Sequence, residues 1–226
     1  AFKDRPHFTK EAARHTILAP QMAPVHFELF QAALGKYGYH VVIPKMPDRD
    51  AIDLGLRYVN NDMCYPAIVV IGQLLQALKS GLYDPDKTSI MLFQTCGACR
   101  ATNYMAVLRK ALVFAGFPKV PVFALYGLET DAFKLSAKLL RDSIKAAVMG
   151  DTLMKLKNRV EPYEKHHGDT QKLYRQWMDK SKEAILKGGS ALYKRTITDM
   201  VKAFDRMPIL DIPRKPRVGI VGEILV

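Results

Sequence analysis

Thiol chemistry is the most specific chemistry that this sequence suggests, because its three cysteines fall in two short loops. Cys96 and Cys99 form a CxxC in the string QTCGACRATNY (94–104), and Cys64 stands in the string NNDMCYPA (60–67). Each loop leads into an apolar run with helical spacing. Backbone N–H groups and the dipole at a helix N-terminus favour a thiolate over a thiol. Cys64 and Cys99 are therefore candidate metal ligands or redox-active groups.

Three kinds of thiol site remain open from the residues alone: a zinc site, a redox disulfide and an iron–sulfur site. Structural zinc usually takes paired knuckles, whereas the chain has a single CxxC, and its adjacent His166 and His167 have no matching cysteine. A thiol–disulfide oxidoreductase would use the CGAC between a strand and a helix, which leaves Cys64 without a role. An iron–sulfur site would use both loops, and the small residues beside Cys99 would let a cluster approach the backbone. A single cysteine in the place of Cys64 is usually a small buried hydrophobic residue, but three cysteines in two such loops weaken that interpretation.

The elements that position these loops alternate between strands and helices along the first half of the chain. Short apolar or β-branched runs occur at 15–20, 40–44, 89–93 and 120–127. Helical spacing of apolar residues occurs between them, at 26–38, 50–59, 65–81 and 103–116. This alternation predicts βαβ units and a parallel sheet, in a Rossmann-like or flavodoxin-like three-layer α/β domain. The CxxC loop would then lie at the carboxyl edge of the sheet, where such folds bind ligands.

The pattern along the chain changes at about residue 131 and again near residue 208. We expect an α/β domain over 1–130, a helical segment or connector over 131–207, and a proline-rich linker with the first strand of a following α/β domain over 208–226. Because a new strand pattern begins just before the last residue, we interpret the chain as an excised fragment of a larger protein, and the following domain of that parent as one of its partners.

Composition excludes several classes of protein. The chain has 226 residues, of which 49% are hydrophobic and 25% charged, as in ordinary globular domains. It has no signal core and no apolar stretch of membrane-spanning length, and its few cysteines form no disulfide framework. We therefore expect a cytoplasmic protein without membrane contact. The net charge of +12 is spread among residues of both signs, which favours a solvated face or an acidic partner surface over a nucleic-acid footprint.

The two cysteine strings, together with their flanking helical runs, resemble a known family. NNDMCYPA and QTCGACRATNY look like the dehydratase-type region of 2-hydroxyacyl-CoA dehydratases and activase-related proteins. That family is related to benzoyl-CoA reductase subunits and to double-cubane cluster proteins. The resemblance extends to HTILAPQMAPVHFELFQAAL and to RKPRVGIVGEILV, and so spans nearly the whole chain.

The resemblance implies that Cys64 and Cys99, with a third cysteine from a later domain, hold an iron–sulfur cluster, either a 4Fe–4S cubane or a double cubane. An isolated fragment would hold that cluster incompletely or not at all. Cys96, where many relatives have glycine, is a less certain ligand. Arg100 would offset the negative charge of the thiolate-bound cluster. Asn103 would donate a hydrogen bond to it or cap the next helix.

The resemblance also implies a reaction class and partners. An ATP-dependent activator would supply a low-potential electron for the radical dehydration or reduction of an acyl-CoA substrate. The parent would be an iron–sulfur lyase or reductase, and the isolated fragment would be inactive. Two alternatives stay open, a thiol–disulfide oxidoreductase that uses the CGAC motif, and a non-catalytic scaffold that binds a partner.

Overall fold

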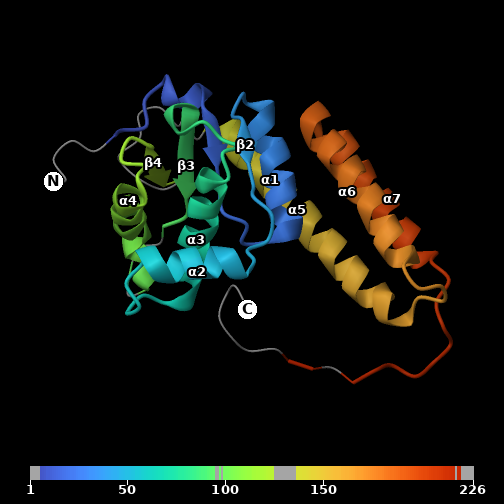
Figure 1. Cartoon of the computed structure of the whole chain (residues 1–226). Coiled ribbons are helices and arrows are strands. Elements are labelled where there is room, and N and C mark those ends of the chain that lie inside the picture. The colour runs from blue at the N-terminus through green and yellow to red at the C-terminus, as the bar shows by residue number, and fades with distance from the viewer. Residues whose placement is uncertain (1–5, 95–96, 98, 125–135, 217, 220–226) are drawn as a thin grey trace. The chain divides into compact units, whose positions relative to one another are not determined.

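The computed structural model describes residues 6–94, 97, 99–124, 136–216 and 218–219 of the chain (Figure 1). Contacts between Cα atoms divide these residues into two compact units. The sheet unit takes its described residues from 6–22 and 38–124, and the helical unit takes them from 23–37 and 136–219. Residues 23–37 thus group with the helices that follow residue 135, although the sequence places them inside the predicted α/β domain.

A parallel sheet forms the centre of the sheet unit. Its described strands are β1 (Thr16–Leu18), β2 (Val41–Val42), β3 (Thr88–Leu92) and β4 (Val122–Ala124). They pair in the order β2-β1-β3-β4, and every pairing is parallel. This order is the beginning of the flavodoxin-like arrangement, in which the strand order reverses between β1 and β3. The predicted α/β class with a parallel sheet is confirmed.

The central strand β3 is buried along its whole length, as expected for a parallel strand that is covered on both faces. Side chains alternate between the two faces of the sheet. One face carries Ile90 and Leu92, which belong to the hydrophobic core shared with the helices α3 and α4. The opposite face carries Phe123, whose ring stacks on Phe8 with 3.9 Å between centroids.

Three α-helices belong to the described part of the sheet unit: α2 (Arg49–Tyr58), α3 (Tyr65–Lys79) and α4 (Tyr104–Ala115). Short 3-10 turns, η1 (Ala12–Arg14), η2 (Pro85–Lys87) and η3 (Arg100–Asn103), join them to the strands. The apolar face expected for α3 is buried, as are most residues on its other sides. Because α3 is apolar all round, it forms the core of the unit, and its N-terminus at Cys64 is held in place by packing.

The helices α2 and α3 cross at very short range because both carry glycine at the crossing (Figure 1). A Cβ atom on Gly72 would lie 1.8 Å from the carbonyl oxygen of Ala51, and one on Gly55 would lie 2.1 Å from that of Ile68. No larger residue fits between the two backbones. This crossing fixes where α2 ends and so positions the turn that carries Cys64.

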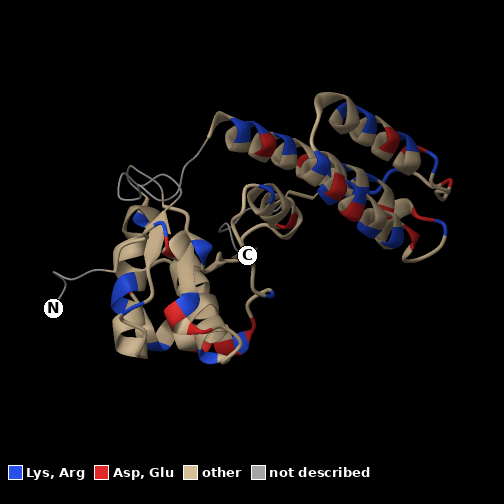
Figure 2. Cartoon of the chain, turned by 90° about the horizontal axis from the view of Figure 1, so that it is seen from above, with Lys and Arg blue, Asp and Glu red and all other residues tan. Residues whose placement is uncertain are grey.

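The helical unit contains α1 (Pro24–Lys36), α5 (Ala137–Val160), η4 (Glu161–Tyr163), α6 (Asp169–Lys187) and α7 (Ser190–Asp205). These helices share an apolar core that includes Leu29, Leu153, Trp177 and Phe204. Bands of both charge signs alternate along the outside of the helices (Figure 2), which agrees with the interspersed charges of the sequence. The sequence predicted the helices of this unit, including one at 26–38. It did not predict that this helix, α1, belongs to the helical unit.

Two buried or partly buried carboxylates hold elements of the helical unit together. Asp142 accepts hydrogen bonds from Lys36 Nζ (2.7 Å) and from the Tyr37 hydroxyl (3.0 Å). Glu164 accepts hydrogen bonds from the backbone N–H groups of Gly168 (2.7 Å) and Thr170 (2.8 Å) at the start of α6. These backbone N–H groups lower the pKa of Glu164 from its usual 4.5 to about 2.

Some expectations fall on residues that the structure does not describe. These are the end of the strand predicted at 120–127, the start of the helical segment at 131, and most of the strand predicted within 208–226. The described residues between 208 and 219 contain no strand beyond an isolated bridge from Ile209 to Glu164. Among the described helices, none combines the length and the apolar character that crossing a bilayer requires.

Candidate functional site

Cys64 occupies the residue just before α3, in an extended conformation with φ −64° and ψ 149°. Pro66 follows in the first turn, where its missing N–H group costs no helical hydrogen bond. The Cys64 side chain is partly buried, and its Sγ shares a hydrogen bond of 3.1 Å with the hydroxyl of Tyr104. The thiol therefore lies at the N-terminus of a buried helix, as the sequence predicts, and it also packs against the edge of the apolar core.

Cys99 occupies the corresponding place before the short 3-10 turn η3. Its side chain is exposed, and its Sγ accepts the backbone N–H of Ala101 at 3.5 Å. Gly97, two residues earlier, has φ +106°, and a Cβ atom there would meet nothing within 4 Å. The backbone of this loop is thus open on the side of Gly97. Cys96 lies outside the described residues.

Two contacts join the loop of Cys64 to the loop of Cys99. The guanidinium of Arg100 donates a hydrogen bond to the backbone carbonyl of Asp62. The hydroxyl of Tyr104, at the start of α4, reaches the sulfur of Cys64. Because α3 and α4 both begin beyond the carboxyl ends of parallel strands, the two loops meet at that edge of the sheet. The structure thus brings the two described cysteines to neighbouring loops that contact each other.

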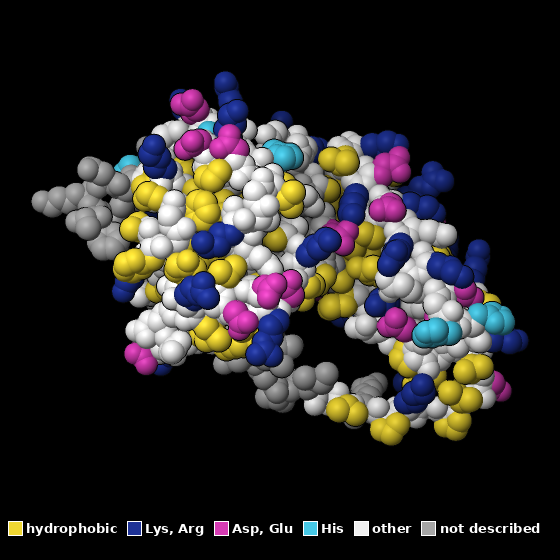
Figure 3. All heavy atoms as spheres, in the orientation of Figure 1, with side chains coloured by type: hydrophobic (Ala, Val, Ile, Leu, Met, Phe, Trp, Pro, Cys, Tyr) yellow, Lys and Arg dark blue, Asp and Glu magenta, His cyan; other side chains and the backbone are white. Residues whose placement is uncertain are grey.

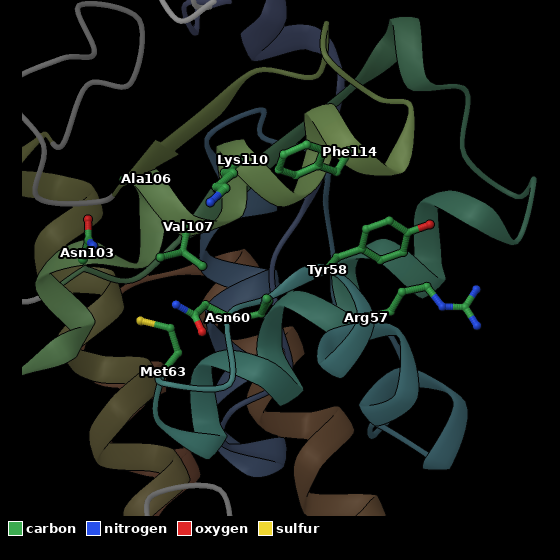
Figure 4. Close-up of a pocket in the computed structure, with 10 residues that line it drawn as sticks. Arg57, Tyr58, Asn60, Met63, Asn103, Ala106, Val107, Lys110 and Phe114 are labelled. Carbon is green, nitrogen blue, oxygen red and sulfur yellow. The ribbon is translucent and has the colours of Figure 1, made fainter.

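Arg100 and Asn103 differ in what they contact. Arg100 donates its hydrogen bond to a backbone carbonyl and so braces one cysteine loop against the other. Asn103 precedes α4, yet its side chain makes no capping hydrogen bond. It lines a cavity beside the two loops instead (Figure 4). Of the two roles considered for Asn103 in the sequence, the helix cap is therefore not the one observed.

Sequence reasoning missed Gln73, which organises the loops that follow β1 and β2. Its side chain is buried inside the otherwise apolar α3. Its Oε1 accepts the backbone N–H of Gln21 at 2.9 Å, and its Nε2 donates to the carbonyl of Lys45 at 2.6 Å. The signal for this role was a polar residue in the middle of a mostly apolar helix, since a polar side chain buried there must find partners.

Beside the cysteine loops lies a cavity of about 530 Å³. Its walls come from the end of α2, the turn that follows it, and one side of α4 (Figure 4). The lining residues are Arg57, Tyr58, Val59, Asn60, Met63, Asn103, Ala106, Val107, Lys110 and Phe114. Neither Tyr58 nor Lys110 was singled out by the sequence, because the cavity joins residues about 50 positions apart in the chain.

The described cysteines are of the right type to bind an iron–sulfur cluster, but there are too few of them to hold one alone. Cysteine thiolates are the usual ligands of such clusters, and the structure describes two of them, Cys64 and Cys99. Within the described residues, no group of three or more His, Cys, Asp or Glu side chains could hold a metal ion. Any further ligand would have to come from Cys96 or from protein beyond the described part of the chain.

Comparison of the chain with protein-family models, with curated proteins and with solved structures gave no match in any of the three.

Proposed function

We propose that this chain is the iron–sulfur-cluster-binding region of a 2-hydroxyacyl-CoA dehydratase-like protein. In this proposal the parent takes a low-potential electron from an ATP-driven activator and uses it for the radical dehydration or reduction of an acyl-CoA. The observation that supports the proposal is the junction of the two cysteine loops, through Arg100 with Asp62 and through Tyr104 with Cys64, at the carboxyl edge of a parallel sheet.

Cys64 and Cys99 would bind the cluster through their sulfur atoms, with Cys96 as a less certain ligand. A thiolate cannot donate a proton, so the Tyr104 hydroxyl would donate its hydrogen bond to the sulfur of Cys64. The N–H of Ala101 points to the sulfur of Cys99 in the same way. Such hydrogen bonds draw charge from the sulfur and make reduction easier. A cluster bound here would supply one-electron chemistry.

Anaerobic reconstitution with iron and sulfide tests the proposal. The wild-type parent protein, which can supply ligands beyond the two described cysteines, should bind both and develop broad brown absorbance. Cys64→Ser and Cys99→Ser should each abolish it, because each removes one of the two described sulfur ligands. Cys96→Ser is the matched control and should have a smaller effect. Iron bound at wild-type level by the Cys64→Ser variant would contradict the proposal.

A thiol–disulfide oxidoreductase is the second candidate, and the exposure of Cys99 favours it. It would cycle Cys96 and Cys99 between dithiol and disulfide without iron, and Cys64→Ser would leave the couple intact. Redox titration of metal-free protein, with the thiol state read by mass spectrometry, separates the two candidates. A scaffold that binds a partner without chemistry would show neither iron binding nor a defined couple.

A further inference from the structure

The cavity beside the cysteine loops has one wall from α2 and one from α4, and its lining has a consistent charge. Arg57 and Lys110 are the charged residues of the lining, and both are cations with exposed side chains. Among the described residues, neither Arg57 nor Lys110 forms an ion pair with a carboxylate. Asn60 and Asn103 add two carboxamides. No lining residue is a carboxylate, although Asn60 Nδ2 donates a hydrogen bond to the Asp62 carboxylate beside the cavity (3.4 Å). The two cations give the lining itself a positive charge, which favours an anion.

The remaining lining is apolar or aromatic. Tyr58 rises from the end of α2, and Val107 and Phe114 come from α4 (Figure 4). Phe114 has 65% of its surface exposed, which is unusual for a phenylalanine on a helix that otherwise packs against the core. The ammonium of Lys110 stands 5.8 Å from the centroid of the Phe114 ring. Cation and aromatic ring thus lie together at one end of the cavity.

The same mixture is visible on the surface. Figure 3 shows hydrophobic side chains and Lys or Arg side chains intermingled over α4 and α2. A ligand for this surface needs an apolar ring to cover the exposed aromatic residues and an anionic group to pair with the cations. The volume of about 530 Å³ lies within the range of ordinary small-molecule sites.

We propose that this cavity binds an aromatic organic anion, a planar ring system that carries a sulfonate, phosphate or carboxylate group. The ring packs against Phe114 and Tyr58, and the anionic group is held by Lys110, while Arg57, which points away from Lys110 in Figure 4, adds positive charge at the other side of the lining. In Figure 4 the side chains of Val107 and Lys110 point from α4 toward Asn60 and Met63 on the facing loop, so that the carboxamide of Asn60 lies within the same space. The site needs no iron, and because Met63 and Asn103 of its lining come from the two cysteine loops, it adjoins the proposed cluster.

Two fluorescent probes test this inference on the metal-free chain. One is 8-anilinonaphthalene-1-sulfonate, and the other is N-phenyl-1-naphthylamine, which has the same rings without the sulfonate. Wild-type protein should bind the sulfonate more tightly. Lys110→Glu should weaken sulfonate binding about tenfold, equivalent to one lost charge-assisted contact, and should remove the preference between the probes. Phe114→Ser should weaken both.

Control variants lie close by but outside the cavity lining. Val113→Ser alters an apolar side chain of α4 that is 45% exposed, and Lys119→Glu alters an exposed cation of the same unit. Both should bind the probes as the wild type does. Equal affinity of the wild type for the two probes would overturn the inference, as would wild-type affinity for the sulfonate in Lys110→Glu. All these side chains are exposed, and unchanged circular dichroism will verify that each variant is folded.

Discussion

Gly72→Ala tests the closest packing in the sheet unit. The added Cβ would lie 1.8 Å from the carbonyl oxygen of Ala51 and 2.8 Å from the backbone nitrogen of Gly55. Both atoms belong to the backbone of α2, so no side-chain rotation can relieve the overlap. The two helices must separate, and the hydrogen bond of 2.8 Å from Gln76 Nε2 to Asp48 Oδ1 between them would be strained as well.

The expected magnitude follows from two opposing effects. Alanine is a better helix former than glycine by about 1 kcal/mol. Overpacking a core costs about 1–3 kcal/mol and more where the neighbours cannot move. Because the contacts at Gly72 are with backbone, we take the upper end, and expect a net loss of about 2 kcal/mol in the free energy of unfolding.

Hydrogen exchange of peptides from α2 and α3, read by mass spectrometry, measures this effect locally. A loss of about 2 kcal/mol corresponds to exchange roughly 30-fold faster for amides whose exchange rate follows the opening equilibrium of these helices. Gly35→Ala is the matched control, because Gly35 also lies in a helix and a Cβ there would meet nothing within 4 Å. That variant should be stabilised by up to about 1 kcal/mol. Unchanged exchange of α3 in Gly72→Ala would refute the close crossing.

Two further predictions concern the helical unit, where the only tryptophan of the chain reports unfolding. Glu164→Gln should lower the melting temperature at pH 7, because the folded state holds the pKa of Glu164 at about 2, below its usual 4.5, and so favours the carboxylate. That contribution is present above pH 4.5 and is lost as the pH falls toward 2, so the difference from wild type should shrink over this window; a constant difference would contradict the assignment. Asp142→Ala should reduce the free energy of unfolding in urea by about 1–3 kcal/mol, since it removes the carboxylate that pairs with Lys36 in a partly buried site and leaves Lys36 only the carbonyl of Ile185. No loss in that variant would show that Lys36 and Tyr37 find water instead.

The strands and helices could be predicted from the sequence because each follows from local pattern. The run at 89–93 is apolar from residue 90 onward, as expected for a central parallel strand, and β3 lies there. The residue at which a helix begins follows less directly from the sequence. Serine is a favoured N-cap residue, yet α7 begins at Ser190 itself, and Gly189 holds the cap position with no side-chain hydrogen bond.

Features that depend on tertiary contact could not be predicted. The spacing of apolar residues at 26–38 indicates a helix with one buried face, but not which partner covers it, and α1 packs with α5 and α6. The role of Gly72 depends on the place where another helix crosses. For the same reason, the sequence indicated that Cys64 and Cys99 lie at one edge of the sheet, but it contained no signal for the contact of Tyr104 with Cys64.

The central claim is that Cys64 and Cys99 share one site, and a cross-link tests it most directly without iron. Dibromobimane becomes fluorescent when both of its arms react with neighbouring thiols. A Cys96→Ser chain keeps only the two described cysteines. We predict that it becomes fluorescent and that mass spectrometry finds a peptide linking Cys64 with Cys99. Two separately labelled thiols with no such link would contradict the claim.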